Sequence, residues 1–187
     1  MENYQLKPEN WSQESYIKAY KFAAQAHQGQ EMPGSNIPYI MHLSFVSMEV
    51  IAALNVEKES NGDLAIQCAL LHDTIEDTDI TFEQINIEFG EAVAKGVLAL
   101  TKNNTIAKYL QMEDSLTRIK QEPKEIWMVK LADRISNLQA PPHYWTSDKI
   151  VRYREEGILI YDALKDASPF LASRLACKIE DYKVFIN

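Results

Sequence analysis

One segment of the sequence, LAIQCALLHDTI (64–75), is apolar on almost every side and carries two ionisable residues, His72 and Asp73, near its end. A helix that is apolar all round is buried on all sides, so the rest of the chain must pack around it. Apolar residues recur at helical spacing along most of that remainder, and strand-like alternation is nearly absent. The chain is therefore predicted to be all-α, a compact single domain.

Capping residues and prolines divide the chain into further helices. The residues expected to cap helices are Ser12, Asp63, Thr81, Ser147 and Ser168, with Pro169 at the first position of the last helix. The expected helices cover about 12–29, a second opened by Pro38, 63–75, 81–90, 91–102, 105–121, 124–139, and two long ones from 147 and 168. No stretch has the composition of a linker, so residues 1–187 are expected to form one domain.

The overall charge limits the partners of this protein. The 187 residues carry a formal net charge of −8, which argues against nucleic acid or a membrane surface as a partner. A small anionic molecule still fits if a metal ion and a few lysines converge on it. The start of the chain, MENYQLKPENW, has no apolar stretch typical of a signal peptide, and Cys68 and Cys177 lie in apolar helical patterns. We therefore expect a cytoplasmic protein with two reduced core cysteines.

The pair His72–Asp73 is costly inside a buried helix unless it is hydrogen-bonded, paired or bound to a metal ion. Glu76 and Asp77 follow four residues after each of them, so a continuing helix would place all four on one side. Such a cluster repels itself unless a cation neutralises it. The plainer alternatives are a hydrogen-bonded core histidine and a solvated acidic turn.

Two further residues extend the candidate site. His42 lies on the inner face of the helix opened by Pro38, and Asp133 lies beside the apolar stripe of the helix at 124–139. The alternatives are a core histidine and a surface pair between Lys130 and Asp133. Taken with His72 and Asp73, these residues form a set of two imidazoles and two carboxylates. That mixture suits a divalent transition ion such as manganese, iron, cobalt or zinc.

The motifs resemble the hydrolase half of the RelA/SpoT alarmone family, within the HD superfamily. They are AHQGQ (26–30), PYIMH (38–42), ALLHDTIEDT (69–78), FG (89–90), LTK (100–102), VKLADRISNL (129–138) and YWTSDKIVRY (144–153). They occur in family order, and the chain resembles a small stand-alone alarmone hydrolase.

The resemblance implies an HD-domain fold and manganese-dependent hydrolysis of the 3′-pyrophosphate of a nucleotide such as (p)ppGpp, with release of pyrophosphate. It implies one divalent ion, usually manganese, held by His42, His72, Asp73 and Asp133, and attack by a water positioned and activated by Glu76 and Asp77. It places Asn137 at the nucleoside, and Lys108, Lys149 and Tyr153 at phosphates. For the lysines, the alternative is a solvated helix surface. His27 in AHQGQ is interpreted as structural.

One departure from the family leaves the nucleobase open. The family usually has an arginine shortly after the GQ pair, where this chain has Glu31-Met32-Pro33-Gly34-Ser35. An adenine alarmone such as (pp)pApp is therefore an alternative to a guanine one. Two other readings remain: a non-catalytic module that senses alarmone, and an HD phosphatase of another 3′- or 2′-phosphorylated nucleotide such as NADPH. Assembly into a homo-oligomer is also open.

Overall fold

The computed structural model describes residues 10–186, and residues 1–9, which hold most of the segment examined for a signal peptide, lie outside them. The described chain is all-helical, as predicted; its only extended pairing is an isolated bridge between Glu31 and Pro38. The α-helices are α1 (Gln13–Ala26), α2 (Ile40–Leu54), α3 (Gly62–Leu71), α4 (Thr74–Asp77), α5 (Phe82–Phe89), α6 (Glu91–Leu100), α7 (Gln111–Ile119), α8 (Lys124–Asn137), α9 (Ser147–Leu164) and α10 (Pro169–Asp181). Short 3-10 turns η1 (Lys108–Leu110), η2 (Lys165–Ala167) and η3 (Tyr182–Phe185) join or follow them.

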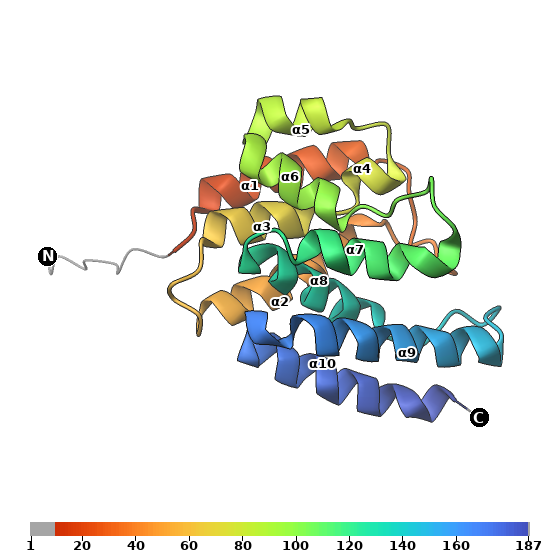
Figure 1. Cartoon of the computed structure of the whole chain (residues 1–187). Coiled ribbons are helices and arrows are strands. Elements are labelled where there is room, and N and C mark those ends of the chain that lie inside the picture. Colours follow the sequence, from red (N-terminus) through yellow and green to blue (C-terminus); the bar gives the residue numbers. More distant parts are fainter. Residues whose placement is uncertain (1–9, 187) are drawn as a thin grey trace, which may run out of the picture.

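The apolar helix α3 lies at the centre of the molecule (Figure 1). It contacts α1, α2, α6 and α8, which together surround it. Its residues Ile66, Leu70 and Leu71 are fully buried. Helix α8 is the second central element, since it packs against α2, α3, α9 and α10. The candidate site lies beside these two helices, because His72 and Asp73 directly follow α3 and Asp133 lies in the second half of α8.

Several predicted helix starts are confirmed. Ser12 accepts a hydrogen bond from the Ser15 N–H, and Ser168 accepts one from the Leu171 N–H, with Pro169 opening α10. Thr81 and Gln84 form a reciprocal capping box at the start of α5. In each case a side-chain oxygen satisfies a backbone N–H that has no partner inside its helix.

Two predicted caps are wrong by one or two residues. Asn61, not Asp63, caps α3 by accepting the Leu64 N–H, and Thr146, not Ser147, caps α9. Asp63 lies in the first turn of α3, where a negative charge is favoured, and its Oδ1 accepts the Ser12 N–H at 2.7 Å. The Asp63 carboxylate therefore joins the start of α1 to the start of the central helix.

Two further expectations are corrected. The helix expected over 105–121 is divided into η1 and α7, with non-helical residues before them. Cys68 is buried as expected, but Cys177 is exposed. Helix α10 lies at the edge of the molecule and buries only one face, through Leu171, Leu175 and Ile179, and Cys177 lies off that face. No described helix is both long and apolar enough to cross a membrane.

Candidate functional site

The site begins where the central helix stops. Helix α3 ends at Leu71, His72 and Asp73 occupy the break, and α4 starts at Thr74. His72 is 3% exposed, and its Nδ1 donates to the Ala69 carbonyl at 2.8 Å. A carbonyl only accepts, so the Nδ1 atom carries a proton and Nε2 is the ring nitrogen that faces the interior.

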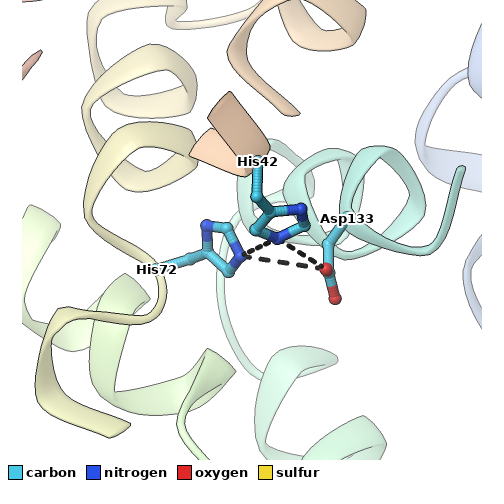
Figure 2. Close-up of side chains that lie close together, drawn as sticks. All are labelled: His42, His72 and Asp133. Atoms are coloured by element: carbon cyan, nitrogen blue, oxygen red, sulfur yellow. Dashed lines mark hydrogen bonds and ion pairs between the residues drawn. The ribbon is translucent and has the colours of Figure 1, made fainter. Parts of the chain in front are cut away.

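His42 from α2 and Asp133 from α8 meet His72 at this point (Figure 2). The Nε2 of His42 lies 3.3 Å from the Nε2 of His72 and 3.4 Å from Oδ1 of Asp133. The three donor atoms lie within 4.8 Å of one another, an arrangement that could hold a metal ion. His42 and His72 are both hydrogen-bonded through Nδ1, to Ser136 Oγ at 3.1 Å for His42, so their inward nitrogens are oriented.

Asp73 adds a second carboxylate to this cluster. Its Oδ2 lies 3.0 Å from Nε2 of His72 and 3.6 Å from Nε2 of His42. The same oxygen accepts a hydrogen bond from the Tyr39 hydroxyl at 2.6 Å. The structure therefore brings together all four residues that the sequence named as metal ligands.

Asp133 is held by two neighbours on its own helix. Its Oδ2 pairs with Lys130 Nζ at 3.0 Å, and its Oδ1 accepts from the Asn137 amide. The side chains of Lys130 and Asp133 are 13% and 10% exposed, so the alternative of a surface pair is wrong. Because Lys130 occupies Oδ2, Asp133 offers Oδ1 to the cluster.

The electrostatics of the cluster favour positive charge. Burial lowers the pKa of His72, but Asp73 and Asp133 outweigh burial and raise it to about 9. Burial raises the pKa of Asp73 and of Asp133, but the positive charge beside them outweighs burial and holds both pKa values below their usual range. Two imidazole nitrogens and two ionised carboxylates in one buried place fit a divalent ion.

Glu76 and Asp77, the acidic turn that follows Asp73, differ in their surroundings. Both carboxylate oxygens of Glu76 bind Lys102, one through its ammonium and the other through its backbone N–H at 2.8 Å. Asp77 lies at the rim, where partial burial and the charges of Asp73 and Glu76 raise its pKa to about 6. Lys102 was not singled out from the sequence, although it ends the LTK motif.

A cavity of about 420 Å³ opens beside the cluster. Its lining includes Tyr39, His72, Asp73, Glu76, Asp77, Lys102, Lys108, Met112, Lys130, Asp133, Arg134, Asn137, Tyr153 and Glu156. Its volume is within the range of small-molecule sites. Metal-ligating geometry, carboxylates and cations are thus combined in one pocket.

Three of the four residues expected to bind substrate, Asn137, Lys108 and Tyr153, line this cavity. Lys149 does not line it, and its ammonium lies 4.0 Å from the centre of the Trp145 ring. The sequence reasoning missed Arg134, whose guanidinium stacks on Tyr153 at 4.3 Å and pairs with Glu156. Arg134 could have been found from the sequence, because it is a charged residue directly after Asp133 in a stretch of the chain that is largely apolar and buried.

Comparisons with known proteins agree with this geometry. The HD domain family matches residues 19–170. Guanosine-3′,5′-bis(diphosphate) 3′-pyrophosphohydrolase MESH1 of Xenopus tropicalis is 32% identical over 168 residues, covering 85% of this chain and 89% of that protein. MESH1 of Danio rerio is 29% identical over 164 residues, with the same coverage of 85% and 89%.

A solved structure of a metazoan ortholog of SpoT that hydrolyses ppGpp has the same fold. The two chains superpose with a TM-score of 0.78 at 24% identity, covering 91% of this chain and 97% of the other. At that identity the likeness concerns the arrangement of the helices.

Proposed function

Since the chain belongs to the HD domain family and is an enzyme of the 3′-pyrophosphohydrolase type, we propose that it removes the 3′-pyrophosphate of an alarmone nucleotide, (p)ppGpp or (pp)pApp. The observation that carries the proposal is the convergence of His42, His72, Asp73 and Asp133 at the wall of a cavity with cationic side chains. We take residues 1–187 as one HD-type domain and a small-molecule nucleotide as its partner, acting in the cytoplasm without nucleic acid or membrane.

The four ligands would hold one divalent ion, and manganese suits their mixture of imidazole and carboxylate donors. When bound at these residues, such an ion would polarise a phosphoryl oxygen and lower the pKa of a water molecule. His42 and His72 are prepared for this task, because their Nδ1 atoms are already engaged and their Nε2 atoms face each other.

The proposed reaction is attack of a water oxygen on the phosphorus that is bonded to the ribose O3′. The bond between that phosphorus and O3′ breaks, pyrophosphate is released carrying the water oxygen, and O3′ takes a proton from solvent to end as a hydroxyl. Glu76 and Asp77 position the water and take its proton. Glu76 is fixed by Lys102, whereas the carboxylate of Asp77 lies at the cavity rim, where a proton can be passed to solvent.

The cations of the cavity would bind the phosphates. Lys108 and Tyr153 line it, and Asn137 lies one helical turn from Asp133, where it can contact the nucleoside. Lys149 is one turn from Tyr153 on α9 and is proposed for the same phosphates. To reach them, its side chain must leave the Trp145 ring.

The test is a panel of ppGpp, pppGpp, ppApp, pppApp and NADPH with added manganese, with released pyrophosphate and phosphate measured. We expect pyrophosphate from one or both alarmone pairs, and loss of turnover in Glu76→Ala, in Asp73→Ala and after chelation. Asp79→Asn is the matched control, because Asp79 is an exposed carboxylate just beyond the turn.

Full activity in Asp73→Ala or after chelation would contradict the proposal. Tight alarmone binding with no turnover at saturating manganese would identify a sensing module instead. Release of phosphate from NADPH, with no pyrophosphate from any alarmone, would identify an HD phosphatase of another 3′- or 2′-phosphorylated nucleotide instead. The ratio of guanine to adenine turnover would settle the base, which the absence of an arginine between Gln30 and Pro38 leaves open.

A further inference from the structure

The connection between α1 and α2 reaches the acidic turn through one side chain. Gln30 donates from Nε2 to the backbone carbonyl of Asp77 at 2.6 Å. Asp77 is the last residue of α4, and carbonyls in the last turn of a helix have no partner inside it. Gln30 therefore satisfies a carbonyl of the turn that carries Glu76 and Asp77.

The orientation of Gln30 is determined by its partners. A carbonyl accepts only, so the Gln30 amide nitrogen must face Asp77 and its Oε1 must face away. That Oε1 lies 2.7 Å from Nδ1 of His27, which must then carry the proton. Within residues 10–186, the Nε2 of His27 is buried without a hydrogen-bond partner, which agrees with a neutral ring in this tautomer.

The backbone holds this unit in place. The Gln30 N–H donates to the His27 carbonyl at 3.0 Å, and the Tyr39 N–H donates to the Gln30 carbonyl at 2.9 Å. The His27 and Tyr39 rings stack with centroids 5.0 Å apart. Tyr39 in turn donates to Asp73, so the same unit contacts the residue before α4 and the residue that ends it.

We propose that Gln30 is a positioning residue, which holds the Glu76–Asp77 turn in register with the metal ligands while His27 fixes the Gln30 side chain. This inference rests on the proposed function, because positioning matters only if the turn takes part in the reaction. A structural role of His27 alone does not account for Gln30, whereas this inference gives a function to both of these residues of the AHQGQ motif. Misplacing a reacting group by about 1 Å costs on the order of 100-fold in rate.

The test is Gln30→Glu, which keeps the shape of the side chain but cannot donate to the Asp77 carbonyl. We expect kcat to fall about 10- to 100-fold with KM and manganese affinity within about twofold of wild type, since substrate and metal contacts remain. Hydrogen–deuterium exchange at residues 74–79 should become faster. Gln30→Met, which removes the donor without adding a charge, should behave alike and replaces Gln30→Glu if that variant does not fold.

Gln28→Glu is the matched control, because Gln28 is exposed and has no side-chain hydrogen bond within residues 10–186. Wild-type kcat in both Gln30 variants would overturn the inference, as would a parallel loss of manganese affinity, which would place the effect on the metal ligands. If wild type and Gln28→Glu both fail to release pyrophosphate, the proposed function fails instead. The exchange rates of the Gln30 variants test separately whether Gln30 holds this turn, and unchanged rates would overturn that.

Discussion

Replacing Tyr39 by phenylalanine removes a single oxygen atom from the support of the candidate metal centre. The Tyr39 hydroxyl donates to Oδ2 of Asp73 at 2.6 Å, and that oxygen also lies 3.0 Å from Nε2 of His72. Burial and the neighbouring Asp73 carboxylate raise the pKa of Tyr39, so the hydroxyl stays protonated and remains a donor. The ring of Tyr39 would still stack on His27 in the variant.

A hydrogen bond to a charged group contributes about 1.5–3 kcal/mol, and the lower end applies because Tyr39 is only half-buried. For a chain of this size, a loss of about 1.5 kcal/mol lowers Tm of the metal-free protein by about 3–6 °C. Changes to groups that are hydrogen-bonded to metal ligands usually lower metal affinity by about 10- to 100-fold, and we expect manganese affinity to fall by about tenfold, the lower limit.

The assay is calorimetric titration of manganese into metal-free protein, with thermal unfolding measured in parallel. Tyr20→Phe is the control, since Tyr20 is also half-buried, stacks on Tyr16, and has no hydroxyl hydrogen bond within the described residues. We expect Tyr20→Phe to match wild type in both measurements. If Tyr39→Phe binds manganese as tightly as wild type, then Tyr39 does not support a metal-binding Asp73 and the reasoning fails.

Three other substitutions or treatments test the packing. A thiol reagent should label Cys177 in the folded protein and Cys68 only on unfolding, because Cys68 is buried and burial raises the pKa of its thiol. Equal labelling rates of the two cysteines would refute this. Gly96→Ala should lower stability by about 1–2 kcal/mol in denaturant unfolding, since its Cβ would lie 2.5 Å from Ile126 Cδ1 and 2.8 Å from Cys68 Sγ. Adding Ile126→Val, which removes only the first of these contacts, should restore part of the loss. Arg118→Lys should cost about 1–2 kcal/mol in the same assay, because Arg118 donates to three carbonyls at the end of α6 and a lysine cannot reach all three; unchanged stability would contradict this.

The parts of the fold that were predictable are those governed by local interactions. The capping box at Thr81 and the Ser168–Pro169 start involve residues within one turn, so their chemistry is visible in the sequence. The cap of α3 was misassigned because both Asn61 and Asp63 are good caps, and the choice depends on distant contacts. Gly62 follows Asn61 and lies so close to the Asn10 carbonyl that a Cβ would clash, which fixes where the helix begins.

The candidate site also has parts that could be predicted from the sequence and parts that could not. Apolar patterning and the cost of buried charge pointed to His72, Asp73, His42 and Asp133, and the structure brings these four together. The distribution of hydrogen bonds around them was not predictable, because Lys102 is 26 residues from Glu76 and Gln30 is 47 residues from Asp77. Nothing in local spacing distinguishes Lys102, which binds the Glu76 carboxylate, from Lys108, which is proposed to bind a phosphate.

The balance of charge in the cavity explains how an acidic chain can accept a polyanionic nucleotide. The overall charge of −8 repels anions at a distance, but at physiological salt such interactions are screened beyond about 8 Å. The charges that line the cavity therefore decide whether an anion is attracted to it. The lining contains the carboxylates of Asp73, Glu76, Asp77, Asp133 and Glu156 and the cations Lys102, Lys108, Lys130 and Arg134. Most of these cations are already paired with those carboxylates, and the protonated His72 ring, which also lines the cavity, leaves the five carboxylates and the five cations in balance. One divalent ion bound at the four proposed ligands, in place of the proton on His72, would give this lining a net positive charge, so the ion proposed to activate water would also make the cavity attractive to the phosphates.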